Sequence, residues 1–304
     1  KLWLGLSSML IILSGVSLFF QGLNYGIDFR GGTTIRTESE ITIDVSKYRQ
    51  ALDALNLGDI VITEVFDPTF RENQNVTQIR IEAQEGDESI TASTVKSVEV
   101  ALSALDPNIK FPLVESVGPK VSSELVKAAV WAVISAIGAV LFYIWLRFEW
   151  QFALGAVLAL VHDIILTMGI FSQVQIKFDL AIIAALLTIV GYSLNDTVVV
   201  FDRVRENLRK YKKKNLSDVL NMSINETLAR TIMTSVTTLL ALFSLYALGG
   251  DVIKGFVFAM IWGVIVGTYS SIFIAGTALL YLGVKRDWSK SSANKGNQFG
   301  DIDA

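Results

Sequence analysis

Three groups of polar residues interrupt segments of this chain that are otherwise apolar enough to cross a membrane. The first is the pair Asn195–Asp196 in "GYSLNDTVVVFDR", about two helical turns before the charged end of an apolar run. A charged side chain inside a bilayer costs about 2.5–3.5 kcal/mol on insertion scales, so it indicates function by default. An interfacial carboxylate hydrated among headgroups is the alternative. Gly191, Ser193 and Thr197 add polarity on several sides, which favours a protein-lined or hydrated interior.

The second group lies at the start of the next apolar run, in "NETLARTIMTSVTTLL". Arg230 is within about a turn of the charged end of that run, at a depth similar to that of Asp196. It shares one helical face with four threonines: Thr227, Thr231, Thr234 and Thr238. A polar stripe on an apolar helix faces the interior of a bundle. An arginine that snorkels to the headgroups is the alternative, but its place on the stripe favours an inward-facing role.

The third group is His162–Asp163, in the middle of another apolar run. Asp163 shares a face with Gly155 and Ala159, and small residues of this kind let two helices approach closely. A lone histidine is most often structural. The adjacent carboxylate and the depth in the membrane leave a proton-linked or polar-network role equally open.

Other chemistries find little support in the composition. The chain has no cysteine and one histidine, so a metal site would depend on carboxylates, and these are dispersed along the sequence. "GLNYGIDFRGG" lacks the lysine and the spacing of a phosphate-binding loop. We therefore expect no enzyme, no metal and no cofactor, with protons as the coupling ion. A carboxylate in a low-dielectric site resists ionisation and a nearby arginine favours it, so movement between them would drive proton uptake and release.

The polar groups are carried by long apolar segments in a chain of 304 residues, 52% hydrophobic, with a mean hydropathy of +0.49. These segments predict six membrane-spanning helices, at about residues 2–21, 124–146, 150–171, 178–201, 227–248 and 252–284. The last is long enough to include a surface segment. The segment 202–225 has seven basic residues against three acidic ones, so the positive-inside rule makes it cytoplasmic. Both termini are then cytoplasmic, and residues 22–121 lie outside.

The outer domain reads as an α+β domain. Alternating patterns predict strands at about 33–38, 60–66, 76–83 and 109–117, and helical patterns fall at 46–57 and 90–105. The order βαββαβ is typical of a ferredoxin-like domain. We expect four parts: a first helix (1–21), this periplasmic domain (22–121), the remaining helices with a basic cytoplasmic loop at 202–225 (122–288), and a disordered tail (289–304). "GxxxG" at Gly263–Gly267 predicts tight helix packing.

Four motifs together carry a resemblance that covers about residues 2–288: "YGIDFRGGT" after the first helix, "HD", "VGYSLNDTVVVFDRVREN" and "NETLARTIMTSVTTLL". The chain closely resembles the SecF family of export-complex subunits, within the SecD/SecF family and the resistance-nodulation-division (RND) superfamily. The resemblance implies half of an RND-type transporter, with six helices and an outer domain after the first. It also implies a signature loop that contains Gly26, Asp28, Arg30, Gly31 and Gly32, of which the last two are expected to be turn residues.

The resemblance implies a function as well. Members of the family pair with SecD, join the SecYEG channel in the bacterial inner membrane, and use the proton-motive force to help unfolded preproteins leave on the periplasmic side. YajC and YidC are further candidate partners, and no nucleic acid is expected. Asp196 and Arg230 would couple protons, supported by the other polar residues named above. Asn195 stands where SecD carries an acid, so this chain would hold part of the proton site. An RND-type small-molecule exporter and a non-transporting scaffold of the translocon are the alternatives.

Overall fold

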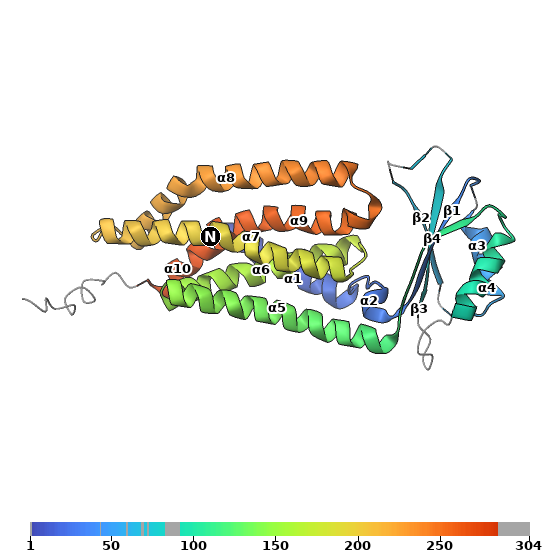
Figure 1. Ribbon diagram of the computed structural model, residues 1–304. Coiled ribbons are helices and arrows are strands. Elements are labelled where there is room, and N and C mark those ends of the chain that lie inside the picture. The colour runs from blue at the N-terminus through green and yellow to red at the C-terminus, as the bar shows by residue number, and fades with distance from the viewer. Residues whose placement is uncertain are drawn as a thin grey trace, which may run out of the picture.

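The computed structural model describes residues 2–42, 44–58, 60–67, 70–71, 73–82 and 92–284. It consists of a long bundle of helices with a small sheet domain at one end (Figure 1). The predicted tail, 289–304, lies outside the described residues. So do the basic residues that follow the last span.

Six long helices form the bundle, as predicted. Five are continuous: α1 (Leu2–Phe20), α5 (Pro119–Arg147), α6 (Trp150–Val174), α7 (Leu180–Lys210) and α8 (Leu216–Leu248). The sixth is one continuous helical rod made of α9 (Asp251–Ser270), the π-helical segment η1 (Ser271–Ala275) and α10 (Gly276–Leu282). Each is long and apolar enough to cross a membrane.

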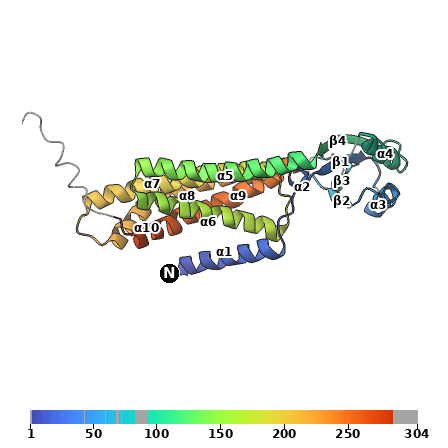
Figure 2. The same ribbon diagram turned by 90° about the horizontal axis from the view of Figure 1, so that it is seen from below.

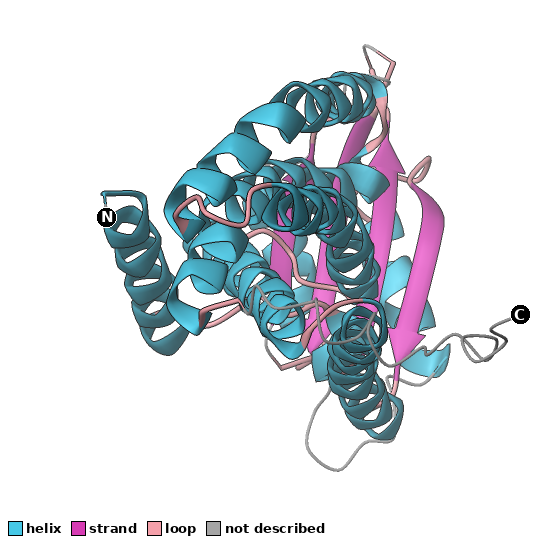
Figure 3. Cartoon of the chain, turned by 90° about the vertical axis from the view of Figure 1, so that its left-hand side faces the viewer, coloured by secondary structure: helices cyan, strands magenta, loops and turns pink. Residues whose placement is uncertain are grey.

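The six helices divide into a centre and a rim. The apolar windows of α6, the α9–α10 rod and α7 are 61%, 56% and 44% buried, whereas those of α1, α5 and α8 are each 11% buried. Figure 2 shows α1 along the edge of the bundle, and the view along the bundle in Figure 3 also leaves the N-terminal helix at the side. The centre is therefore complete within this chain, while the rim helices present large apolar surfaces to lipid or to a partner.

The helices α7 and α8 extend beyond the predicted span ends. At 31 residues, α7 is roughly 46 Å long, and a bilayer core is about 30 Å thick. The segment predicted as a basic loop, 202–225, is consequently mostly helical, and only residues 211–215 connect the two helices. Polar contacts hold the extensions together: the Asn207 amide donates to the Ser223 hydroxyl (3.0 Å), and Arg203 pairs with Glu226.

Close approach of α7 and α9 depends on the predicted GxxxG pair. A Cβ atom on Gly263 would collide with Ile189, and one on Gly267 would lie 3.1 Å from the Ser193 Cβ. The predicted tight packing is thus confirmed, with α7 as the partner helix.

The sheet domain has the predicted βαββαβ order. Its elements are β1 (Gly32–Ser39), α3 (Val45–Asp53), β2 (Ile60–Val65), β3 (Asn75–Glu82), α4 (Ala92–Ser103) and β4 (Lys110–Val117). The strands lie in the order β2-β3-β1-β4, and each neighbouring pair is antiparallel. The helices α3 and α4 cover the face turned away from the bundle (Figure 1). Ile35, Ile79 and Ile81 of the sheet pack there against Leu52 and Leu102, and all five are fully buried.

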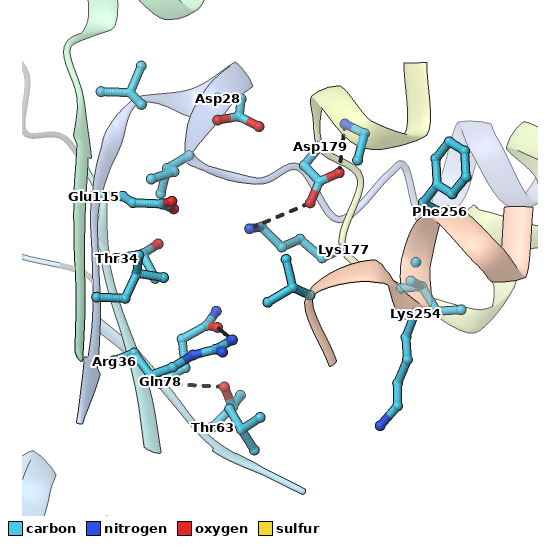
Figure 4. A pocket seen from close by; sticks show the side chains of 18 of the residues that line it. Asp28, Thr34, Arg36, Thr63, Gln78, Glu115, Lys177, Asp179, Lys254 and Phe256 are labelled. Atoms are coloured by element: carbon cyan, nitrogen blue, oxygen red, sulfur yellow. Dashed lines mark hydrogen bonds and ion pairs between the residues drawn. The ribbon is translucent and has the colours of Figure 1, made fainter. Parts of the chain in front are cut away.

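The opposite face of the sheet looks toward the bundle across a cleft of about 820 Å³. Figure 4 shows Thr34, Arg36 and Gln78 on the sheet side of this cleft, facing Lys177 and Lys254 of the bundle. A one-turn helix that the sequence did not predict, α2 (Ile27–Arg30), lies in the connection between α1 and β1.

Candidate functional site

Asp196 lies on α7 and points into the protein. Its side chain is 3% exposed, and its Oδ2 atom has no hydrogen-bond donor among the described residues. Arg230 on α8 attracts it electrostatically. Arg230 itself is exposed, and no hydrogen bond or ion pair joins the two within the described part of the chain. The buried Asp196 carboxylate and the exposed Arg230 are therefore close enough to attract each other but are not in contact.

The register of α7 against α8 explains this spacing. Asp196 comes level with Thr234, and Arg230 lies about one turn toward the basic end of the bundle. Three contacts between the antiparallel helices set the register: Tyr192 OH to Thr238 Oγ1 (3.3 Å), Arg203 to Glu226, and Asn207 Nδ2 to Ser223 Oγ (3.0 Å).

The predicted threonine stripe of α8 does face the bundle. Thr227 and Thr231 are buried, and Thr234 and Thr238 are half-buried. Three of the hydroxyls donate to carbonyls of α8 itself, Thr227 and Thr234 at 3.1 Å and Thr238 at 2.8 Å. The Thr231 hydroxyl is buried and has no partner in the described structure. In addition to Asp196 Oδ2 on α7, the Thr231 hydroxyl on α8 is thus a second buried polar atom without a hydrogen-bond partner in the described structure.

Asn195 and Thr197, the neighbours of Asp196, face in different directions. Thr197 is buried and donates to the Ser193 carbonyl (3.0 Å). Asn195 is exposed, and no hydrogen bond links it to another described residue. It continues an exposed stripe of small and polar residues on α7: Ala184, Thr188, Gly191 and Asn195. The sequence predicted Asn195 as part of an internal polar network. This prediction is wrong, because the side chain of Asn195 is exposed.

Asp163 is the best-satisfied polar group of the bundle centre. Its carboxylate is 1% exposed. Oδ2 accepts hydrogen bonds from Ser193 of α7 (2.7 Å) and Ser270 of α9 (2.8 Å), while Oδ1 lies 3.1 Å from His162 Nδ1. Ser270 directly precedes η1, and such π-helical turns occur often at functional sites. One carboxylate thus joins the three central helices α6, α7 and α9.

His162 extends this network toward α1. Its ring stacks on Tyr269 with the centroids 6.0 Å apart. The Tyr269 hydroxyl donates to the Trp3 carbonyl (2.7 Å) and also contacts the Ser7 hydroxyl (2.7 Å). The other ring nitrogen, Nε2, is buried and has no hydrogen-bond partner among the described residues. The sequence predicted His162 and Asp163, included Ser193 only in the polar stretch around Asp196, and missed Ser270 and Tyr269. Serines within an apolar run were the available signal.

The signature loop forms a separate site at the outer end of the bundle. Asp28 accepts a hydrogen bond from the N–H of Leu180, the first residue of α7 (3.1 Å), and Arg30 pairs with Glu82 of β3 (2.9 Å). Gly31 and Gly32 have φ angles of 77° and 127°, which only glycine adopts readily. Gly31 caps α2, whereas Gly32 is already the first residue of β1.

Comparison with known proteins identifies the family to which the chain is similar. The family model described as "Protein export membrane protein SecD/SecF, C-terminal" matches residues 97–285, and that of the "SecD/SecF GG Motif" matches residues 16–40. A protein named protein translocase subunit SecF from Cereibacter sphaeroides is 59% identical over 300 residues, covering 99% of this chain and 93% of the relative. A SecF protein from Rickettsia bellii is 42% identical, covering 91% and 90%.

The chain belongs to the SecD/SecF family. The longer family match contains Asp163, Asp196 and Arg230, and the GG-motif match contains Gly31 and Gly32. The expected resemblance to SecF and the expected half-transporter of six helices are confirmed.

Solved structures of this family agree with the fold. The crystal structure of SecDF, described as a translocon-associated membrane protein from Thermus thermophilus, matches with a TM-score of 0.80 and 35% identity. It covers 91% of this chain, while this chain spans 37% of that one. SecDF in a "Super-membrane-facing form" matches with a TM-score of 0.66, and this chain spans 38% of it. The solved SecDF chains are therefore much longer than this one.

Removing the serine donors of Asp163 should weaken the bundle centre. We expect Ser193→Ala and Ser270→Ala each to cost about 1–3 kcal/mol, because a buried acceptor loses a donor. Each should lower the unfolding temperature by roughly 2–10 °C in thermal unfolding of the purified protein in detergent.

Ser244→Ala is the matched control, since this exposed hydroxyl of α8 donates only to its own helix, at the Leu240 carbonyl. Equal unfolding temperatures for all three variants would contradict the structural role of the Asp163 network.

Proposed function

We propose that this chain is the SecF-type half of a SecD–SecF complex that uses proton movement across the bacterial inner membrane to assist SecYEG-dependent translocation and release of preproteins. The observation that carries the proposal is Asp196, a carboxylate 3% exposed inside a membrane helix with an unsatisfied oxygen. Such a group is costly in hydrocarbon and is typical of proton or ion pathways.

The incompleteness of the site supports a second membrane half as partner. Arg230 and Asn195 are both exposed on the outside of this chain. Asn195 is the neighbour of the buried Asp196 on α7, and Arg230 lies on α8 about one turn from the level of Asp196. The length of the solved SecDF chains leaves room for such a half. An acid of the partner facing Asn195 would meet Arg230 and Asp196 at one interface, and SecD is the expected partner.

Relative movement of the two halves then changes the environment of Asp196. When Arg230 approaches and water enters, the ionised form is favoured; when the site closes, the protonated form is favoured. One charge crossing 100 mV supplies about 2.3 kcal/mol, enough to bias a two-state movement. In the part of the chain that the structure describes, no three His, Cys, Asp or Glu side chains gather as metal ligands.

The charges at one end of the bundle support an orientation in the membrane. The end opposite the sheet carries a dense basic group: Arg147, Arg203, Arg205, Arg209, Lys210, Lys212, Lys213 and Lys214. By the positive-inside rule this end is cytoplasmic, so the sheet domain is periplasmic and both termini lie in the cytoplasm.

Asp196→Asn tests the proposal directly. The amide keeps the shape of the side chain but cannot take up a proton, so both proton flux and export should fall to the level of membranes without the complex. Proton flux and preprotein export would be measured together in membrane vesicles that contain SecD and this chain.

Asp202→Asn is the control, because this exposed carboxylate lies on the same helix and pairs only loosely with Arg147 (3.5 Å). Normal flux and export in Asp196→Asn, with an intact SecD complex, would overturn proton coupling and favour a scaffold.

Arg230→Lys examines the second member of the site. Lysine keeps the charge but loses the planar fork of donors that suits a carboxylate. We expect export to drop several-fold while the complex with SecD still assembles, as measured by co-purification. Export equal to wild type would argue against any geometric role of Arg230 toward Asp196.

A further inference from the structure

Residues 24–30, which we call the strap, lead from α1 into the sheet and run beside the turn between α6 and α7. Phe178 N–H donates to the Asn24 carbonyl (2.7 Å), and Gly26 N–H donates to the Phe178 carbonyl (2.8 Å). These two hydrogen bonds pair the backbone of the strap with the backbone of the α6–α7 turn.

The same strap is bound to the sheet. Arg80 of β3 donates to the Tyr25 carbonyl (3.1 Å), and Arg30 forms an ion pair with Glu82, also on β3 (2.9 Å). Each exposed contact is worth at most about 1 kcal/mol. Together they orient the strap against one strand, so that a rotation of the sheet must carry the strap with it.

Asp28 connects the strap to the first turn of α7. Its carboxylate accepts the Leu180 N–H (3.1 Å), and Asp179 accepts the Ala181 N–H (3.1 Å). The first N–H groups of a helix lack partners within the helix, and negative charge is favoured at this end. The helix α7 therefore has two caps. Asp179 is local, whereas Asp28 comes from 152 residues earlier in the chain.

The cleft of about 820 Å³, which Asp28 of the strap also lines, separates the sheet from the bundle. Figure 4 shows Thr34, Arg36 and Glu115 on one wall and Lys177 and Asp179 on the other, with open space between them. One exposed contact crosses the cleft, from Lys254 Nζ to the Phe66 carbonyl (3.3 Å). Because exposed polar contacts are weak, the sheet can tilt with little repacking. The strap stays attached to both sides during such a tilt.

From these contacts we infer that the strap transmits movement of the outer sheet to α7, with Asp28 as the positioning residue that holds the first turn of α7. Asp196 lies on the same continuous helix, roughly 24 Å along its axis from Leu180. A displacement of Leu180 therefore reaches the membrane site through a rigid rod. This inference rests on the proposed function, because it assigns the strap a role in coupling export to Asp196.

The test compares three variants in membrane vesicles that contain SecD and the full chain. Asp28→Ala should reduce export by about threefold to tenfold, because the strap then loses its side-chain hydrogen bond to the first turn of α7. Asp196-dependent proton flux should remain. Asp28→Asn should restore export, since an amide oxygen still accepts the Leu180 N–H. Asp179→Ala is the matched control: it removes the local cap of the same turn but leaves the strap attached, and export should stay within about twofold of wild type.

A cross-link separates attachment from local helix stability. The chain has no cysteine, so Tyr25→Cys with Phe178→Cys would introduce a single pair where the strap and the α6–α7 turn form a β-bridge. In an Asp28→Ala background, closing this disulfide should restore export relative to the reduced form.

Three results would overturn the inference: wild-type export in Asp28→Ala, equal losses in Asp28→Ala and Asp179→Ala, or no recovery on cross-linking. A failure of the proposed function would look different. Normal export and flux in Asp196→Asn would then be seen with the strap intact.

Discussion

A polar atom that has no hydrogen-bond partner inside hydrocarbon costs several kcal/mol. The arrangement of the central helices depends on which buried polar groups find their partners within this chain. Asp163 is satisfied entirely from within, by two serines of neighbouring helices and by His162. Asp196, at a similar degree of burial, is not. The two carboxylates therefore suit different roles. Asp163 holds α6, α7 and α9 together, and under the proposed function Asp196 is the group that exchanges protons.

The hydrogen-bond network of Asp163 fixes the position of the site at Asp196. Serine hydroxyls reach Asp163 because Gly267 lets α9 approach Ser193 closely. The α7 helix is thereby fixed on its inner side, while its outer side exposes Asn195 and the rim helix α8 exposes Arg230. A partner that covers this rim would complete the polar site, and the strap at the outer end of α7 would connect the same helix to the sheet domain.

Much of the architecture could be predicted from the sequence because it is periodic. Apolar runs of sufficient length predicted six spans, and alternating patterns predicted the βαββαβ order of the outer domain. The ends of α7 and α8 were missed, since charged residues in "FDRVRENLRK" are as compatible with an amphipathic helix as with a loop. The candidate polar residues were recognisable by their types, because an ionisable side chain in an apolar run is rare.

What could not be predicted was which polar residues meet. Ser193 and Ser270 lie on other spans than Asp163. Ser193 stands in the polar stretch around Asp196, but no periodic signal links either serine to Asp163. The outward direction of Asn195, adjacent to the inward Asp196, depends on the rotation of α7 within the bundle. That rotation is set by packing against α9. Likewise, the contact of Asp28 with Leu180 joins two segments that share no periodic signal.

The central claim is that Asp196 belongs to a proton site that this chain holds only in part. It is tested most directly by proton flux in proteoliposomes that contain this chain alone or this chain with SecD, each as wild type and as Asp196→Asn. The account predicts a flux that depends on Asp196 only when SecD is present. An equal Asp196-dependent flux from this chain alone would contradict it.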